Sequence, residues 1–437
     1  MQTQQNKISL IWFKNNLRIH DNPSITKAIN NSRKVIAVYC FDPRYFQINH
    51  FGFKRTEKFR AKFLIESIID LKANLEKHHI PLFIYQKKLE HCIPKIVADH
   101  QVTDIFLQTE WTHEETLILK GVKRHLPENI RFTESFEQFL FHPEDVPFAI
   151  EHLPKVFTDF RKIIEKQVIV RPLSQNALIN FKQPAINNPT KIPSLSDLGF
   201  EYFDTHPNSA FPFKGGETHA LTHVEHYIFK TKKLGVYKKT RNGLIGTNYS
   251  SKLSPWLANG SLSPKLVYYE VKRFENEHFS NQSTYWLIFE LLWRDYFKYI
   301  SIKYGNQIFK VKGILNKNYT WLNNKDTIEQ WIDGKTPEPF VNANMIELKK
   351  TGWMSNRGRQ NVASYFAKHL TLDWRIGASY FESLLLDYDV HSNYGNWMYV
   401  AGVGNDPRDR KFNIKSQAER YDPNGSYQRL WLQNTLF

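Results

Sequence analysis

Polar and charged side chains are embedded in aromatic, helix-forming stretches of the carboxyl half of this sequence. Taken singly, each is more typical of an ordinary core or surface polar group than of a site. Together they suggest a binding site for a ligand that is polar and planar. The set comprises Tyr237, Arg241, residues 249–254, Glu290, Trp293, Arg294, Asn356, Arg359, Asp387, Asp389 and Asn393.

The segment SSKLSP has the composition of a phosphate-binding site. Ser254 followed by Pro255 predicts a helix start, with the serine hydroxyl as N-cap and the proline at the first helical position. Free backbone N–H groups at such a start attract anions, and Ser250, Ser251 and Lys252 add hydroxyls and a positive charge. The segment could therefore hold a pyrophosphate.

Asp387 and Asp389 place two carboxylates two residues apart in the stretch LLLDYDV. Such carboxylates can accept hydrogen bonds from a heterocycle N–H or from sugar hydroxyls. Combined with a pyrophosphate site, they predict a dinucleotide cofactor.

Three histidines, His219, His223 and His226, fall at i, i+4 and i+7 of one predicted helix, where they could face a metal ion. No acidic residue follows in an HExxH arrangement, and both flanks are typical of solvated helix ends. A GxSxG nucleophile motif is also absent. The sequence therefore does not favour hydrolysis by a metal ion or a serine, and we expect no metal.

The elements that must position these side chains fall into two halves. Residues 1–135 alternate short apolar runs with helical stretches, which predicts a doubly wound parallel sheet in an α/β domain. In the predicted helix at residues 59–77, Leu64, Ile68 and Leu71 recur on one face. The GxGxxG and GxxxxGK[ST] phosphate motifs are absent from this half. The five predicted strands are residues 8–13, 35–41, 82–85, 104–108 and 130–134.

The second half is predicted to be all-α. Residues 136–211 lose periodicity and are rich in Pro, Asn and Ser, which predicts a long linker between domains. Residues 212–437 carry helical patterns with few β runs, and Ser263 before a proline marks a further helix start. The helical stretches are residues 216–232, 263–277, 283–305, 326–334, 342–352, 359–370 and 378–389.

Composition limits the class of protein. With 437 residues, 41% apolar and 23% charged, the chain suits two soluble domains and has no run long enough to span a membrane. The amino end, MQTQQNK, has no signal or transit character, so we expect a cytoplasmic protein. Lys and Arg outnumber Asp and Glu by 59 to 43, which fits a polyanionic partner or a solvated basic surface. Two cysteines without a CxxC pair disfavour a disulfide framework.

Six longer motifs follow one another through the chain. They are WFKNNLRIHDNPSI, GLIGTNYSSKLSPWLANGSLSP, YWLIFELLWRDYF, TGWMSNRGRQNVASYF, DWRIGASYFESLLLDYDVHSNYGNW and AGVGNDPRDRKFNI. In composition, order and spacing they resemble the photolyase and cryptochrome family, and most closely its DASH branch. The resemblance implies an amino-terminal α/β domain and a carboxyl-terminal helical domain that binds FAD. This division agrees with the one that the periodicity predicts.

The resemblance also implies an FAD site. Asn393 matches the position that faces flavin N5, where an amide can hydrogen-bond the reduced ring. Arg294, Asn356 and Arg359 match contacts to the polar edges of the cofactor. Residues that match contacts to the FAD phosphates, ribose and isoalloxazine are Tyr237, Ser250, Ser251, Lys252, Leu253, Ser254, Asp387 and Asp389.

Trp397, Trp374 and Trp321 match the family's chain of tryptophans, which passes electrons from the surface to the light-excited flavin. Indole rings are large, oxidisable and tolerant of burial. On residue type alone, three tryptophans in aromatic-rich helices could equally be packing residues. The resemblance favours the electron-transfer role.

For the substrate, Glu290 and Trp293 match residues that hydrogen-bond and stack on a cyclobutane pyrimidine dimer flipped into the pocket. Arg241, Asn356 and Arg357 match contacts to DNA, where basic side chains neutralise phosphates. Flipping a dimer out of duplex DNA costs a few kcal/mol, and less from a single strand.

Two positions depart from the standard dimer photolyases. The second aromatic wall is Tyr399 instead of a tryptophan, and Gln360 stands where a methionine is expected near the lesion. Both changes are usual in the DASH branch. A smaller ring and a polar side chain stabilise a flipped dimer less, so we expect activity mainly on single-stranded DNA.

A light-harvesting antenna is also implied. The DASH branch usually binds 5,10-methenyltetrahydrofolate between the domains, with an acidic residue after the fourth strand. Glu110 or Glu114 could serve. Both could equally be solvated carboxylates at a helix start, which the helix dipole favours.

The function we predict is light-driven repair of cyclobutane pyrimidine dimers, by electron transfer from photoexcited reduced FAD, in a protein that we expect to be a monomer. The alternative is a blue-light photoreceptor that signals through the flavin redox state without repair. Signalling cryptochromes often carry a long carboxyl-terminal tail, which is not expected in a chain that stops at Phe437. A dark flavin oxidoreductase is a third option, but no nicotinamide-binding motif supports it.

Overall fold

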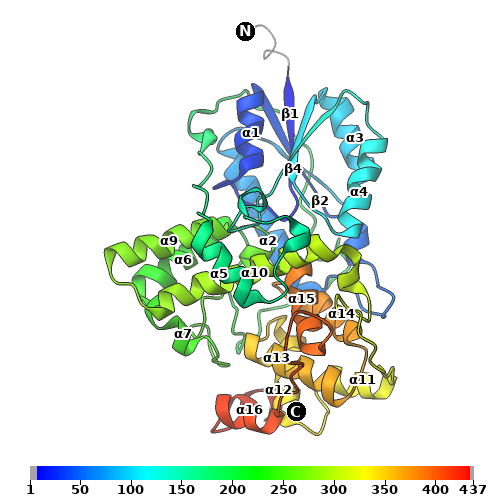
Figure 1. Ribbon diagram of the computed structural model, residues 1–437. Coiled ribbons are helices and arrows are strands. Elements are labelled where there is room, and N and C mark those ends of the chain that lie inside the picture. Colours follow the sequence, from blue (N-terminus) through cyan, green and yellow to red (C-terminus); the bar gives the residue numbers. More distant parts are fainter. Residues whose placement is uncertain (1–6, 434–437) are drawn as a thin grey trace.

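The computed structural model describes residues 7–433. Residues 1–6 of the amino end interpreted above therefore lie outside the described residues. An α/β domain packs on a helical domain (Figure 1). Within the described part of the chain, none of the helices combines the length and apolar character needed to cross a membrane.

Five parallel strands form one sheet in the order β3-β2-β1-β4-β5. Each agrees with a predicted run to within one residue at either end, which confirms the α/β prediction. The strands are β1 (Ile8–Trp12), β2 (Lys34–Cys40), β3 (Leu82–Tyr85), β4 (Asp104–Gln108) and β5 (Arg131–Ser135).

Helices cover both faces of this sheet, as the doubly wound pattern predicts. Successive strand side chains point to opposite faces: Ile11 and Phe13 lie in one buried cluster, and Leu10 and Trp12 in the other. The first cluster includes residues of α1 and α2, and the second includes residues of α3 and α4. These helices are α1 (Pro23–Asn31), α2 (Lys58–Glu76), α3 (Leu89–His100) and α4 (His113–Arg124).

The strand order reverses between β1 and β4, because the chain fills one side of β1 before it crosses to the other. In open α/β sheets such a reversal leaves a crevice outside the carboxyl ends of the two strands. Lys14 follows β1 and Glu110 follows β4, so both lie at this crevice.

The segment predicted as a linker contains a helix that the sequence analysis did not predict. Phe157, Phe160 and Ile164 of α5 (Phe157–Gln167) are buried in the core of the helical domain. Near the start of this segment, the buried Asp295 carboxylate accepts the backbone N–H groups of Leu140 at 3.0 Å and Phe141 at 2.8 Å. Part of the connection thus packs into the second domain, and the predicted domain boundaries stay a prediction.

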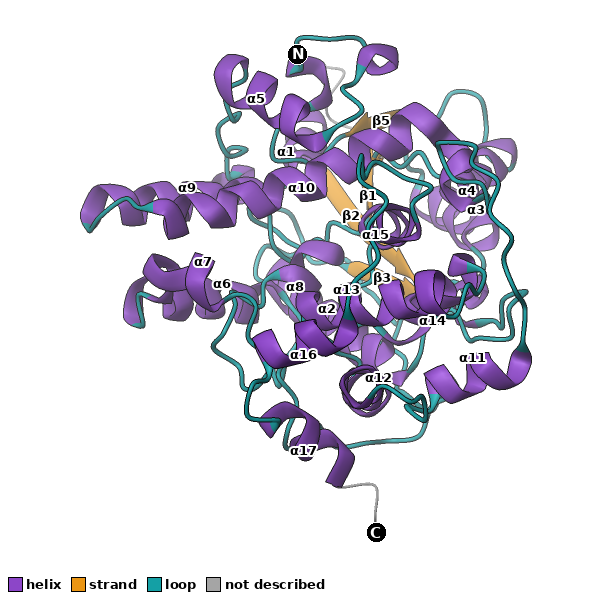
Figure 2. Cartoon of the chain, turned by 60° about the horizontal axis from the view of Figure 1, so that its bottom comes forward, coloured by secondary structure: helices purple, strands orange, loops and turns teal. Residues whose placement is uncertain are grey.

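Each predicted helical stretch overlaps a helix, although the last of them ends at Leu384 and not at Asp389, and three further helices follow it within the described residues. Apart from an isolated bridge between Leu322 and Leu372, the regular elements described between residues 212 and 433 are helices. Short π-helical turns at His226–Lys230 and Tyr365–His369 continue α6 and α13. Figure 2 shows α8, α10, α13, α14 and α15 in the middle of this domain. The helices are α6 (Glu217–Glu225), α7 (Tyr237–Thr240), α8 (Ser254–Ala258), α9 (Pro264–Glu277), α10 (Gln282–Tyr304), α11 (Lys325–Ile332), α12 (Pro339–Thr351), α13 (Asn356–Ser364), α14 (Trp374–Leu384), α15 (Val390–Ala401), α16 (Ile414–Tyr421) and α17 (Ser426–Leu432).

The loop after β1 docks on the helical domain. Gly260, at φ +72°, lies so close to this loop that an added Cβ would be 1.9 Å from the Asn15 carbonyl oxygen. The buried Arg18 guanidinium donates to the carbonyl oxygens of Gly260 and Glu137, each at 3.0 Å. These contacts bring the crevice of the sheet against the helices that carry the predicted cofactor residues.

Candidate functional site

An ion pair joins two of the predicted cofactor residues, the half-buried Arg359 and the buried Asp387. Arg359 on α13 donates from Nη2 to both carboxylate oxygens of Asp387, at 2.9 and 3.0 Å. Ser254 at the start of α8 donates its hydroxyl to Asp387 Oδ2 at 2.6 Å. Asp387 thereby joins three segments that are far apart in the sequence.

The helix start at Ser254 differs from the prediction. Leu253 occupies the cap position, and Ser254 is the first helical residue with no capping hydrogen bond. Its hydroxyl instead donates to the Asp387 carboxylate, which is a charge-assisted hydrogen bond. The matching prediction for Ser263 is confirmed, since its hydroxyl accepts the N–H of Leu266 at 3.4 Å.

Lys252 does not present its charge as the sequence suggests. The residue is 2% exposed, with its Nζ 3.2 Å from the Tyr249 ring centroid and 4.6 Å from that of Trp353. Among the described residues this Nζ has no hydrogen-bond partner, and burial lowers the pKa of Lys252 well below its usual value. The Lys252 backbone is in the left-handed region, at φ +56°, and therefore turns the chain just before α8.

The three spaced histidines do not converge. His219 and His226 are exposed, whereas His223 is buried and its Nε2 lies 2.9 Å from the Ser251 carbonyl oxygen. His223 therefore supports the segment before α8. No group of three potential metal ligands occurs within residues 7–433.

Asp389 forms a second buried ion pair, which the sequence analysis did not predict. Lys298 on α10 donates to Asp389 Oδ2 at 2.9 Å, while Oδ1 accepts the Ser392 N–H and caps α15. Burial opposes ionisation, but Lys298, His391 and Arg294 outweigh it and lower the pKa of Asp389. Lys298 follows Arg294 by four residues on α10, a spacing that could have revealed it.

The Asn393 amide is oriented by the neighbouring helix. Its Nδ2 donates to the Ala378 carbonyl oxygen of α14 at 2.9 Å, which leaves the amide oxygen as an acceptor on the other side. The other residues predicted to contact the cofactor differ in exposure. Tyr237, Ser251 and Leu253 are buried, Ser250 and Arg294 are half-buried, and Asn356 is exposed.

This set of donors and acceptors fits FAD. Serine hydroxyls can donate to a diphosphate, Asp387 and Asp389 can accept from sugar hydroxyls or a heterocycle N–H, and Asn393 can accept from a reduced ring. Trp397 Nε1 is buried and has no hydrogen-bond partner among the described residues.

The packed helices α14 and α15 each carry one of the three predicted relay tryptophans. An added Cβ at Gly377, one turn after Trp374, would lie 2.2 Å from Trp397 Cη2. Trp374 in turn packs against Tyr394 of α15, with ring centroids 6.1 Å apart. Trp321 precedes the Leu322–Leu372 bridge, which places it beside the start of α14. Trp374 and Trp397 are buried, and Trp321 is partly exposed.

Trp293 of α10 and Tyr399 of α15 make a corner of two aromatic rings. The Trp293 and Tyr399 centroids are 5.9 Å apart, with the planes at 89°. Phe157 of α5 stacks on Trp293 at 3.7 Å and 13°, which holds the indole in place. Both Trp293 and Tyr399 remain partly exposed.

The charged and polar side chains predicted to contact the dimer or the DNA are paired with one another. Arg241 Nη2 lies 2.7 Å from Glu290 Oε1, with the two side chains 16% and 28% exposed. Arg357 donates to Gln360 Oε1 at 2.9 Å. Burial raises the pKa of Glu290, and Arg241 opposes this shift.

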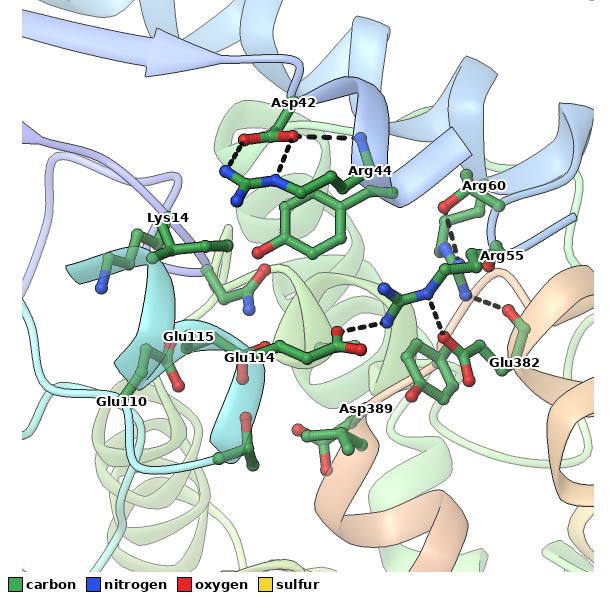
Figure 3. Close-up of a pocket in the computed structure, with 18 of the residues that line it drawn as sticks. Lys14, Asp42, Arg44, Arg55, Arg60, Glu110, Glu114, Glu115, Glu382 and Asp389 are labelled. Carbon is green, nitrogen blue, oxygen red and sulfur yellow. Dashed lines mark hydrogen bonds and ion pairs between the residues drawn. The ribbon is translucent and has the colours of Figure 1, made fainter. Parts of the chain in front are cut away.

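A cavity of about 910 Å³ lies between the two domains. Lys14 and Glu110 line it from the sheet crevice, and Asp389 lines it from the helical domain (Figure 3). Arg294 is a further lining residue from the helical domain. Burial raises the pKa of Glu110 and lowers that of Lys14. The predicted antenna and cofactor sites are therefore neighbours.

The two candidate antenna carboxylates differ in their surroundings. Glu114 is 52% exposed and pairs with Arg55 at 2.6 Å, and Arg55 also pairs with Glu382 of α14 at 3.2 Å. Glu110 Oε1 accepts a hydrogen bond from the Gln108 side-chain amide at 2.6 Å. Burial and the nearby Glu110 raise the pKa of Glu115 to about 7. Arg55, Glu115 and Glu382 were not predicted, because only the fold brings them to this cavity.

Known proteins share this architecture. Residues 9–177 match the family described as DNA photolyase, and residues 286–435 match the FAD binding domain of DNA photolyase. A cryptochrome DASH of Gloeobacter violaceus is 44% identical and covers 98% of this chain and 85% of its own length. One of Synechocystis is 45% identical over 97% of this chain and 87% of its own. The crystal structure of a Synechocystis cryptochrome has a TM-score of 0.94 and 44% identity, covering 99% of this chain and 90% of that one.

The fold and these matches define a protein of the photolyase type with an FAD-binding helical domain, so the chain belongs to the photolyase and cryptochrome family. Within the family it is similar over nearly its whole length to the cryptochromes of the DASH type. The resemblance that the six motifs indicate is confirmed. The cytoplasmic location and the monomeric state stay predictions.

Proposed function

We propose that this protein uses blue or near-ultraviolet light to split cyclobutane pyrimidine dimers in single-stranded DNA. The observation that carries this proposal is the corner of Trp293 and Tyr399, together with Glu290, which lies three residues before Trp293 on α10 and pairs with Arg241. FAD, when bound, supplies a chromophore that donates an electron on excitation. The side chains of the protein bind the dimer, orient the cofactor and transfer electrons to it.

The corner can hold two linked pyrimidines. The Trp293 indole offers a stacking surface, and Tyr399 stands at right angles to it as a second wall. Glu290 is the carboxyl assigned to hydrogen-bond a base of the dimer, and burial, opposed by Arg241, raises its pKa toward the protonated form that can donate such a bond. Arg241 can then bind a neighbouring phosphate.

Two features support a preference for single strands. Tyr399 accepts a hydrogen bond from Arg410 at 3.3 Å, and Gln360 accepts one from Arg357 at 2.9 Å. Both lesion-facing side chains are thus polar and already engaged, so they contribute less apolar contact to a flipped dimer. Less binding energy is then available to offset the opening of a duplex.

We assign the relay tryptophans and Asn393 to keeping the cofactor in its reduced state. Trp397, Trp374 and Trp321 lead from the buried helices to a partly exposed ring and can carry an electron inward. The Asn393 amide oxygen can accept the N–H that the reduced ring carries, which favours that state.

The interdomain cavity is assigned to a 5,10-methenyltetrahydrofolate antenna. Its volume of about 910 Å³ is ample for a folate, and Glu110 lies at the strand crossover where ligands of open α/β sheets bind. Glu110 suits this role better than Glu114, because Glu114 is largely exposed and already paired with Arg55.

Replacing Glu110 with alanine is expected to remove the folate while FAD is retained. Loss of one buried hydrogen bond costs about 1–3 kcal/mol, which weakens folate binding by roughly five- to 150-fold. Folate and FAD extracted from the purified protein would be measured by absorbance. Glu114→Ala serves as the matched variant, and equal folate content in both variants would contradict the assignment.

Repair itself is tested with a dimer-containing single-stranded oligonucleotide, illuminated in the presence of FAD-loaded protein and a reductant. We expect light-dependent recovery of pyrimidine absorbance. Glu290→Ala is expected to lower the repair yield about two- to tenfold, as for the loss of one hydrogen bond of ~0.5–1.5 kcal/mol.

Glu277→Ala, at an exposed glutamate of α9, provides the control and is expected to leave the yield unchanged. Absence of repair by protein with verified reduced FAD would reject the proposed function. In that case a light-dependent response in cells would favour the photoreceptor alternative.

A further inference from the structure

Tyr319 lies beside the outermost tryptophan of the proposed relay. Its ring centroid is 5.5 Å from that of Trp321, with the planes tilted by 57°. Both rings are partly exposed, in the segment between α10 and α11. Rings in such contact can exchange an electron without an intervening group.

The Tyr319 phenol has a proton acceptor in place. Its hydroxyl donates to Asp409 Oδ2 at 2.8 Å. Burial and this bond raise the pKa of Tyr319 to about 12, so the phenol keeps its proton until the ring is oxidised. Burial disfavours the charged form of Asp409, but the bonds from Lys368 and Tyr319 outweigh it and lower the pKa. The carboxylate is therefore ionised, and it already accepts the hydrogen bond along which the phenolic proton can move.

Three segments build this arrangement. Asp409, after α15, also pairs with Lys368 in the π-helical turn that follows α13, and Lys368 Nζ lies 4.7 Å from the Tyr319 ring centroid. Gly402 makes room for the pair, since an added Cβ would be 1.9 Å from Asp409 Oδ1 and 2.7 Å from Lys368 Nζ. Gly402 has φ +80°, a conformation that glycine adopts without strain.

We infer that Tyr319 is the terminal electron donor of the relay and that Asp409 takes its proton. This inference rests on the proposed function, because the relay must first oxidise Trp321. The Trp321 radical cation gains one electron from Tyr319, and the phenolic proton moves to Asp409 Oδ2. The products are neutral Trp321, a neutral tyrosyl radical and a protonated carboxyl, so charge and protons balance.

The transfer would make the charge separation last longer. Once the proton has left, an electron can return to Tyr319 only together with a proton. A soluble thiol can then restore the phenol by donating a hydrogen atom, becoming a thiyl radical, and Asp409 releases its proton to water. The partly exposed ring is accessible for this step.

Flash photolysis and light-induced electron paramagnetic resonance of the FAD-loaded protein test the inference. In the unaltered chain, decay of a tryptophan radical is expected to match the rise of a tyrosyl radical. Tyr319→Phe keeps the ring contact but removes the hydroxyl, so the tyrosyl signal should vanish and the tryptophan radical should live longer. Asp409→Asn keeps a hydrogen-bond acceptor of low basicity, and should slow tyrosine oxidation roughly 10²-fold.

Tyr202→Phe is the matched control. Tyr202 also donates to a carboxylate at 2.8 Å, that of Asp204, but it lies in the connecting segment before α6. Its replacement should leave both radical signals unchanged. A tyrosyl radical that persists in Tyr319→Phe, or that is lost in Tyr202→Phe, overturns the assignment.

Oxidation by azide radicals in the dark tests the role of Tyr319 independently of the light-driven relay. Azide radicals oxidise tryptophan without light, so the Trp321–Tyr319 step can be followed by its radical spectra in the same variants. If light yields no tryptophan radical, the proposed relay is wrong. The dark experiment then supports the Tyr319 assignment if the tyrosyl signal depends on Tyr319, and overturns it if the signal does not.

Discussion

Replacing Asp387 with asparagine is expected to lower the free energy of unfolding by about 3–5 kcal/mol and to abolish stable retention of FAD. The Asp387 side chain is 3% exposed and receives two bonds from Arg359 and one from Ser254. An asparagine in its place would leave the Arg359 charge unpaired, and would no longer hold α8 against α13.

Denaturant unfolding and the flavin-to-protein ratio after gel filtration measure these two effects. Asp333→Asn is the matched control, because Asp333 also pairs with a basic side chain, Lys349 at 2.7 Å, but is 37% exposed. Exposed pairs contribute about 0–1 kcal/mol, so this variant should keep its stability and flavin. An Asp387→Asn protein that retains flavin at the unaltered ratio would contradict the assignment of Asp387 to the cofactor site.

Replacing Trp293 with alanine is expected to weaken binding of a dimer-containing single strand by about 1–3 kcal/mol, the contribution of one aromatic stacking surface. This corresponds to a roughly five- to 150-fold rise in Kd. Binding of an undamaged strand should change little, because phosphate contacts dominate it. Titration of both oligonucleotides at one fixed salt concentration gives the comparison.

Trp293→Ala removes two contacts at once, the stack on Phe157 and the proposed stacking surface for the dimer. A second variant is needed to separate their effects. Phe157→Leu removes the 3.7 Å stack but leaves Trp293 to face the ligand. It should lower stability by about 0.5–1.5 kcal/mol with little effect on dimer binding. Equal loss of affinity in both variants would show that Trp293 acts by packing rather than by contact with DNA.

Local patterns were sufficient to predict most of the elements. Leu10 and Ile11 alternate between the two faces of β1, and the residues of β4 continue the same pattern, because strand side chains point to opposite sides in turn. The helix α5 was missed, since its short amphipathic stretch lies within a segment dominated by Pro and Asn.

Side-chain partners were harder to predict than elements. Ser254 has the sequence of an N-cap, but a carboxylate 133 positions away takes its hydroxyl. Lys252 has the charge for a phosphate, but the fold buries it over two aromatic rings. Contacts of this kind depend on how distant helices pack, and periodicity holds no information about that packing.

The sequence alone determined the sheet, most of the helices and the family, because short-range periodicity and motif order are properties of the chain itself. Only the tertiary structure decided the interdomain cavity, the pairing of Lys298 with Asp389, and the contact of Tyr319 with Trp321 and Asp409. The physical reason is distance along the chain. A hydrogen bond between residues 90 positions apart exists only when packing brings both ends to the same point.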